Sequence, residues 1–238
     1  MMSVLYDNRD IYKEIVLDLP FREGIGIITH SEAKTHPNVR LINTPTWTTL
    51  PSGLMTIGLT GASSEYLEAD AADTANLDFT TGDYSIGVWI KWTAGVQSQI
   101  IIGRYEVNVT GWEIYLDVSG GLNTVSQRHS HVSLAPNTNS NCYSTGWTPA
   151  TWFLLGISRI GGDLYPVHHR NGVPLTMSYE ASGMLDADSC NQDLVIGARY
   201  SKDANFYTGL MWRPRVWPKA LTAEDWVTLY ELEKGWFA

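Results

Sequence analysis

Four oxygen-bearing side chains stand close together in the segment 186–193: Asp186, Asp188, Asn191 and Asp193. Calcium is a hard cation that binds about six to eight oxygen ligands, so this segment is a candidate calcium site. It lacks, however, the central glycine and the terminal bidentate glutamate of an EF-hand loop. We therefore interpret the segment as a polar turn and keep calcium as the alternative. The sequence indicates no other cofactor.

Two histidine pairs raise the question of zinc, which imidazole nitrogens bind well. His129 and His131 would lie on one face of a strand, because alternate side chains of a strand share a face. The adjacent His168 and His169 could lie nearby. Such pairs are more typical of ordinary strand positions, so we predict no zinc site.

Glycoside hydrolysis needs two carboxylates placed on either side of the scissile bond. One strand can present them in the pattern Glu-x-Asp-x-(x)-Glu, since alternate residues face the same way. The nearest match begins at Glu68 and Asp70, but it continues with Asp73 in place of glutamate and lacks strand-forming neighbours. We expect a solvated acidic loop there. The sequence also lacks a nucleophile elbow, a phosphate-binding loop and a dinucleotide fingerprint. We predict that the protein is not an enzyme.

Aromatic side chains are numerous, with 10 tryptophans and 12 tyrosines, and their ring faces can stack on sugars. Tryptophans within strand patterns are predicted to be core residues: Trp89, Trp112, Trp152 and Trp212. Trp147 and Tyr143 differ, because they stand in the polar segment 134–151, which we interpret as a long exposed loop. We name them as candidate ligand-binding residues. The alternative is that they anchor their own loop or a neighbouring subunit.

The two cysteines, Cys142 and Cys190, both stand in segments rich in Asn and Ser. A disulfide between them is one interpretation. Two cysteines in a chain without a secretion signal are more often free thiols, and the N-terminal residues carry neither a basic region nor an apolar run of a signal peptide.

Composition and charge exclude several classes of protein. Hydrophobic residues make up 44% of the 238 residues and charged residues only 17%, which suits a β-rich domain with a large core. The net charge of −9 argues against binding to nucleic acid, which requires a basic face. The chain has no run of 18 apolar residues, so no membrane insertion is expected.

Strand patterns separated by turn signals run along most of the chain. The predicted strands are rich in Val, Ile, Tyr and Trp and cover residues 14–21, 85–92, 98–107, 111–118, 152–160 and 193–200. Gly120-Gly121 and Asn171-Gly172 are the signals of tight hairpins. No repeat and no linker divides the chain. The pattern predicts one all-β domain.

The C-terminal residues predict a strand followed by one helix. Pro214 and Pro218 favour an edge strand or a bulged strand over residues 210–217. Thr222 is then a good N-cap, with Asp225 in the capping-box position.

The order of these motifs resembles the LamG-like, or concanavalin A-like, lectin and glucanase jelly rolls over residues 14–233. The motifs that carry the resemblance are LTGASSEYLEAD, GDYSIGVWIK, WFLLGISRI, HHRNGVPL, DLVIGARY and PKALTAEDW. The resemblance implies a two-sheet antiparallel jelly-roll β-sandwich with a short C-terminal helix sealing one edge. We assign residues 14–238 to this domain and interpret residues 1–13 as an extended N-terminal arm.

This architecture hosts proteins of many functions, so function needs separate arguments. Because no signal peptide is recognisable, we favour a non-enzymatic surface protein of a virion, either a capsid decoration or a tail-associated protein. Its expected partners are other copies of itself and neighbouring virion proteins, with glycans as further ligands. The alternative is a carbohydrate-binding or adhesion module at a cell surface or outside the cell. A glycoside hydrolase is the third and least favoured hypothesis.

Overall fold

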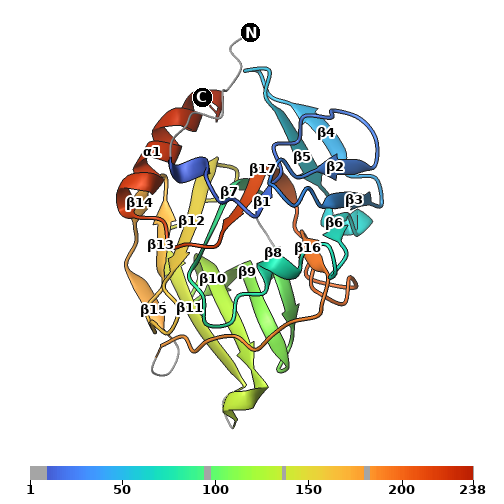
Figure 1. Ribbon diagram of the computed structural model, residues 1–238. Helices are drawn as coiled ribbons and strands as arrows, with labels where there is room; N and C mark the ends of the chain where they lie inside the picture. The colour runs from blue at the N-terminus through green and yellow to red at the C-terminus, as the bar shows by residue number, and fades with distance from the viewer. Residues whose placement is uncertain (1–9, 94–97, 136–137, 180–182, 238) are drawn as a thin grey trace.

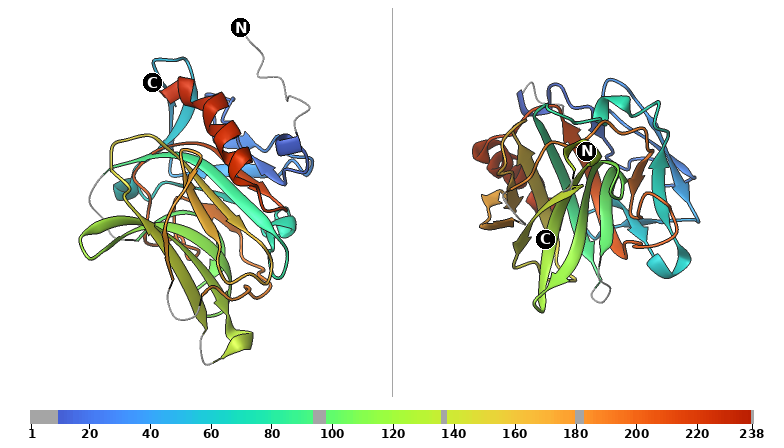
Figure 2. Two further views of the ribbon diagram at one scale, coloured as in Figure 1. Left: turned by 90° about the vertical axis from the view of Figure 1, so that its left-hand side faces the viewer. Right: turned by 90° about the horizontal axis from the view of Figure 1, so that it is seen from below.

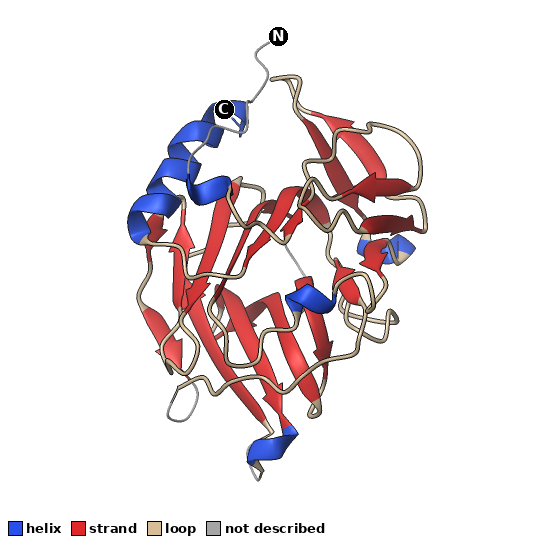
Figure 3. Cartoon of the chain, in the orientation of Figure 1, coloured by secondary structure: helices blue, strands red, loops and turns tan. Residues whose placement is uncertain are grey.

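The computed structural model describes residues 10–93, 98–135, 138–179 and 183–237, which form two antiparallel sheets (Figure 1). Sheet A has the order β14-β13-β12-β7-β17-β5-β4, with β1 paired to β17. Sheet B has the order β15-β11-β10-β9-β8-β16-β6-β3-β2. The expected two-sheet jelly-roll sandwich is confirmed, and Figure 3 shows how little of the chain is helical.

The bounds of the elements are as follows. Sheet A contains β1 (Leu17–Asp18), β4 (Thr46–Thr49), β5 (Met55–Leu59), β7 (Tyr84–Trp92), β12 (Phe153–Arg159), β13 (Val167–Arg170), β14 (Val173–Pro174) and β17 (Gly209–Trp217). Sheet B contains β2 (Ile28–His30), β3 (Asn38–Ile42), β6 (Tyr66–Ala69), β8 (Gln99–Glu106), β9 (Thr110–Ser119), β10 (Leu122–His131), β11 (Asn139–Thr145), β15 (Met177–Tyr179) and β16 (Leu194–Ile196). The helices are α1 (Ala223–Glu233) and the short 3-10 turns η1 (Asp10–Tyr12), η2 (Gly61–Ser63), η3 (Ala75–Leu77), η4 (Val132–Leu134) and η5 (Lys234–Phe237).

Alternation along the strands builds the core between the sheets. Ile57, Met211 and Ile90 are opposite one another on β5, β17 and β7, and all three are fully buried. Trp112 and Ile114 fill the same interior from β9. In the described part of the chain, no helix is long and apolar enough to cross a bilayer.

Strand β17 lies in the middle of sheet A, and of the two predicted alternatives, an edge strand or a bulged strand, the bulged strand is confirmed. The register with β7 shifts between Trp212 and Arg215, where Arg213 has a φ of 51° and Pro214 follows. The extra residue places both Trp212 and Arg215 on the outer face and returns Val216 to the core. Proline is accommodated because the bulge interrupts the ladder there.

Helix α1 begins as predicted. The Thr222 hydroxyl accepts a hydrogen bond from the Asp225 N–H, and the Asp225 carboxylate accepts one from the Thr222 N–H. The helix lies over a face of sheet A rather than only sealing an edge. Trp226 packs on Gly87 of β7 and Gly156 of β12, where a Cβ would lie 3.0 Å and 2.6 Å from the indole ring. Figure 2 shows α1 along the outside of the strands.

The segment 134–151 is not the exposed loop that its polar composition suggests. It contains β11, which pairs with β10 and β15 and has buried residues at alternate positions. The buried residues are Ser140, Cys142 and Ser144, which are small and polar. Cys142 and Cys190 are both free and buried, and burial raises the pKa of each thiol.

The proposed N-terminal arm, residues 1–13, falls mostly outside the described residues. Its last part packs on the same domain. Ile11 is buried, and its carbonyl accepts a hydrogen bond from the indole N–H of Trp217 at 2.7 Å. Residues 10–12 therefore belong to the sandwich.

The histidines considered for zinc lie in the core and have protein partners. The Nε2 of His129 lies 2.6 Å from the Tyr84 hydroxyl, and its Nδ1 lies 2.8 Å from the Leu185 carbonyl oxygen. The Nδ1 of His168 lies 2.9 Å from the Ser144 hydroxyl. Within the described residues, no group of three or more His, Cys, Asp and Glu side chains is arranged to hold a metal.

Burial governs the ionisation of these rings. It lowers the pKa of His129 and of His168 to about 3, and that of His169, whose ring stacks on Trp226, to about 4. The folded state therefore holds all three rings neutral at a pH where an unfolded chain would bind protons on them.

Trp226→Ala should lower the free energy of unfolding by about 3–5 kcal/mol, because it opens a cavity between α1 and two glycines. Urea denaturation measures the change. Val227→Ala is the matched control, since Val227 is exposed on the same helix, and it should stay within about 0.5 kcal/mol of the wild type. A loss below 1 kcal/mol for Trp226→Ala would contradict this packing.

His168→Gln should make stability less dependent on pH in acid. In the wild type, stability from this ring is complete above its unfolded pKa of about 6.5 and falls as pH decreases toward 3. Between pH 6 and 4, the free energy of unfolding of the variant should fall by about 1.4 kcal/mol less per pH unit than that of the wild type. Urea titrations at several pH values measure it, with the exposed His30→Gln as control. Equal slopes for His168→Gln and the wild type would rule out the buried neutral ring.

Candidate functional site

A pocket of about 230 Å³ lies on the outer face of sheet B, and we call it the β8–β10 pocket. Its walls come from β8, β9 and β10, and its rim comes from the segment 198–205 and residues that include Ser98. Ligand sites for larger molecules usually enclose about 300–1,000 Å³, so this pocket suits a ligand the size of one ring.

The floor of the pocket is a buried ion pair. Glu113 of β9 and Arg128 of β10 are directly opposite in the register, and both point to the outer face. The Arg128 Nε donates to Glu113 Oε1 at 2.9 Å, and its Nη2 contacts the same oxygen. Only 2% of the Glu113 side chain is exposed, and burial raises the pKa of this carboxyl above its ordinary value while Arg128 opposes the shift.

Two tyrosines hold Arg128 in place. Its guanidinium carbon lies 4.9 Å from the ring centroid of Tyr105 and 4.9 Å from that of Tyr115, so the cation is stacked between two aromatic faces. Burial raises the pKa of the Tyr115 hydroxyl to about 12, which keeps it a neutral donor and acceptor. The floor is therefore rigid before any ligand arrives.

Polar groups with spare hydrogen-bonding capacity lie around the floor. Arg199 is half-buried with its guanidinium carbon 5.4 Å from the Tyr200 ring centroid, and Asp117 lies further along β9. In the described part of the chain, neither Arg199 nor Asp117 forms an ion pair with another side chain. The Asn205 amide donates to the Ser98 carbonyl at 2.6 Å and closes the rim. The pocket thus offers both a cationic donor and an anionic acceptor.

Of the two aromatic candidates, Tyr143 lies beside this pocket and Trp147 does not. Tyr143 is half-buried on β11, opposite Ser126, which is itself opposite Tyr115. The expectation that Trp147 faces solvent is wrong. Its side chain is buried, its indole N–H donates to the Ser144 hydroxyl at 3.1 Å, and its ring meets Phe153 edge to face.

The candidate calcium ligands are held by separate protein partners. Asp186 forms an ion pair of 2.7 Å with the buried Arg159. Asp188 accepts hydrogen bonds from the backbone N–H of Ser133 at 2.8 Å and from its hydroxyl. Asn191 is exposed. The arrangement accounts for Asp186 and Asp188 as anchors of their loop.

The carboxylates considered for hydrolysis belong to an ion-pair network. Glu68 lies in β6, so the expectation of a loop at this residue is wrong. Arg40 contacts Glu68 at 3.1 Å and Asp70 at 2.7 Å. Lys202 contacts Glu68 at 2.6 Å and Asp193, the last calcium candidate, at 2.8 Å. Each of these three acids is thus paired with one or both of two cations, and the network lies on the outer face of sheet B.

The sequence contains a local signal for the pocket in the tight turn Gly120-Gly121. This turn fixes the register of the hairpin that it closes. The register places Glu113 opposite Arg128, an opposite-charge pair across two strands.

Comparison with known proteins supports the architecture. Residues 64–225 match the laminin G family, described as the concanavalin A-like lectin/glucanases superfamily. Among solved structures, the botulinum neurotoxin serotype G binding domain has a TM-score of 0.69 at 13% identity and covers 92% of this chain and 51% of its own. No curated protein matches the chain at a significant level.

Two further structures have similar folds. The binding domain of Paraclostridial Mosquitocidal Protein 1 has a TM-score of 0.69 at 12% identity, covering 92% of this chain and 52% of its own. The serotype D ligand binding domain in complex with N-acetylneuraminic acid has a TM-score of 0.67 at 15% identity, covering 92% and 51%. The chain thus spans about half the length of these domains, and the likeness concerns the fold. On the family match, which covers more than half of the residues, the chain belongs to the concanavalin A-like lectin/glucanase superfamily.

Proposed function

We propose that this protein is a carbohydrate-binding interaction module and that the β8–β10 pocket holds a sugar ring. The observation that carries the proposal is the rigid floor, in which Arg128 is bound to Glu113 and stacked between two tyrosines. Sugar hydroxyls both donate and accept hydrogen bonds, so they can pair with Arg199 and with Asp117 at the same time. The family match and the sialic acid bound to one structural neighbour support a sugar as the ligand.

Binding suits this pocket better than hydrolysis. The pocket has two carboxylates, Glu113 and Asp117, which lie on the same face of β9 four residues apart. A rise of about 3.3 Å per residue separates their backbones by about 13 Å. Glycosidases need carboxyl groups about 5–5.5 Å or about 6.5–9.5 Å apart. Arg128 also holds the Glu113 carboxylate, which leaves it poorly placed to exchange protons with a substrate.

Tyr200→Ala should weaken binding of the glycan that a glycan array identifies by at least 10-fold, because it removes the aromatic wall and the support of Arg199. Calorimetric titration measures the loss. Tyr165→Ala is the matched control, since Tyr165 is exposed outside the pocket. The melting temperature of both variants should stay near that of the wild type. Equal affinity of Tyr200→Ala and the wild type would refute the pocket, and an array without any bound glycan would refute the function.

We further propose that the module works on the surface of a virion, in contact with other copies of itself and with neighbouring virion proteins. An apolar surface supports such contacts. Ile25, Ile27 and Ile28 are 80%, 66% and 41% exposed; Ile28 begins β2, the strand that ends the order of sheet B, and the other two lie just before it. Exposed apolar residues at a sheet edge are typical of a contact between proteins.

Immunogold electron microscopy of the native source material tests this setting, with an antibody raised against the chain. We expect regular gold label on particles and loss of that label when the antibody is first saturated with the pure protein. Label confined to cell walls or to the soluble fraction would contradict the virion setting and leave the carbohydrate-binding proposal standing.

A further inference from the structure

The outer face of sheet A is covered only in part. Helix α1 and η5 pack on the rows of Gly87 and Trp89, and the Trp89 ring stacks on Phe237 with 4.0 Å between centroids. Trp212, opposite Trp89, also meets Phe237. Further along the same face of β7 lies Lys91, which is half-buried and lines a groove together with residues of three other strands.

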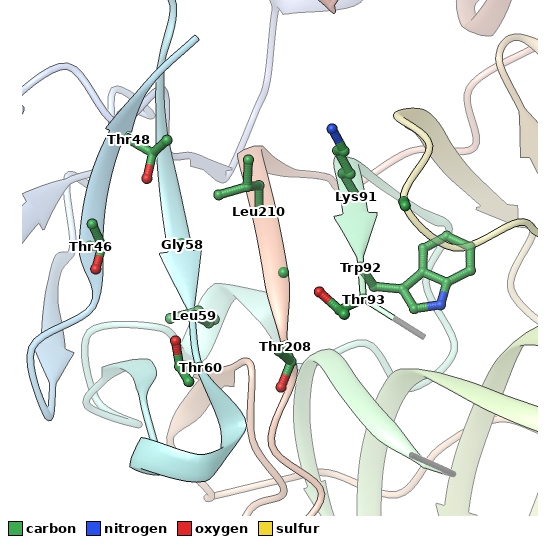
Figure 4. A pocket seen from close by; sticks show the side chains of 12 residues that line it. Thr46, Thr48, Gly58, Leu59, Thr60, Lys91, Trp92, Thr93, Thr208 and Leu210 are labelled. Atoms are coloured by element: carbon green, nitrogen blue, oxygen red, sulfur yellow. The ribbon is translucent and has the colours of Figure 1, made fainter. Parts of the chain in front are cut away.

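This groove has a volume of about 430 Å³ and lies across β4, β5, β17 and β7 (Figure 4). Thr46, Gly58, Leu210 and Lys91 are opposite one another in consecutive strands and form one row across it. Its volume lies within the range of about 300–1,000 Å³ that is usual for ligand sites. It is distinct from the β8–β10 pocket, which lies on sheet B.

Two glycines determine the shape of the groove: one leaves space within it, and the other lets two of its strands approach closely. A Cβ on Gly58 would lie 3.2 Å from the Leu210 side chain, so a larger residue would fill the space between β4 and β17. Gly209 has a φ of 149°, and a Cβ there would lie 2.3 Å from the Lys91 carbonyl oxygen. The backbone of β17 can therefore approach β7 closely only because residue 209 is glycine.

Hydroxyl groups line the groove and a single charge stands in it. The hydroxyls belong to Thr46, Thr48, Thr60, Thr93 and Thr208. The Thr208 hydroxyl accepts a hydrogen bond from the Gly61 N–H at 3.0 Å, which leaves its own hydrogen for a ligand. Among the described residues, no carboxylate lines the groove and Lys91 forms no ion pair. In a chain of net charge −9, the Lys91 ammonium is therefore a local positive charge that attracts an anion.

We propose that this groove binds a segment of an acidic polysaccharide, with a sugar carboxylate at the Lys91 ammonium and ring hydroxyls along the threonines. A hydroxyl-rich chain matches the threonines, because both partners donate and accept hydrogen bonds. Because Lys91 is positively charged and no carboxylate of the described residues lines the groove, a carboxylated sugar is favoured over a neutral one. The groove spans four strands, so a chain of more than one ring can lie across it.

Calorimetric titration with tetragalacturonic acid and with its full methyl ester tests the proposal on the whole protein. The two probes share one backbone and differ only in charge. We expect the acid to bind at least 10-fold more tightly than the ester, and raised salt to weaken the acid only. Lys91→Gln should weaken binding of the acid at least 10-fold. The double variant T46V/T48V, which keeps the β-branched shape without hydroxyls, should weaken both probes.

Lys34→Gln is the control for loss of a surface cation elsewhere, and Tyr200→Ala is the control for the other pocket; neither should change binding of the acid. Equal binding of acid and ester would overturn the acidic ligand. Unchanged binding in Lys91→Gln would overturn the groove as its site, as would a loss in Tyr200→Ala equal to that in Lys91→Gln. Absence of binding by the wild type would overturn the proposal, and it would leave the β8–β10 pocket to its own test.

Discussion

A single buried carboxylate, that of Glu233, joins the helix to the sandwich. It accepts hydrogen bonds from Arg215 at 2.7 Å and 2.9 Å and from the indole N–H of Trp89 at 2.7 Å. Arg213 reaches Glu233 at 3.3 Å and binds both carboxylate oxygens of Asp18, the last residue of β1. Leaving any of these charges buried without its partner would cost about 3–5 kcal/mol. The helix, the central strand β17 and the first strand must therefore come together as one unit.

The bulge in β17 makes this network compatible with a packed core. In an unbroken strand, Arg215 would face the opposite side from Trp212, and the guanidinium would enter the interior. The extra residue moves Arg215 to the outer face beneath Glu233 and turns Val216 inward. Residues before the bulge keep the register that points Leu210 into the groove of sheet A. One local irregularity thus serves both the anchor of the helix and the open surface beside it.

The sequence predicts the elements whose signals are local. It does not predict the contacts between residues that are far apart in the chain. The long strands β7, β8, β9 and β12 and the capped helix follow from alternation and from Thr222 with Asp225. The sequence does not predict strand β11, because its inward residues contact a polar part of the core and the strand therefore lacks hydrophobic alternation. The burial of Trp147 depends on Ser144 and Phe153, which no local pattern reveals. Predicting the Glu113–Arg128 pair requires the register of the hairpin. Predicting the groove requires the pairing of four strands from distant parts of the chain.

The two glycines beneath Trp226 constrain how the sequences of related chains can change. The sheet surface has a hollow at Gly87 and Gly156, and the indole ring fills it. A change at any one of these positions alone would lower stability. A side chain at 87 or 156 would collide with the ring, and a small residue at 226 would leave the hollow empty. Related chains should therefore vary these three positions together, with bulk on the strands where the helix carries a small residue. Homologues in which the helix has been lost or moved should carry side chains at both glycine positions.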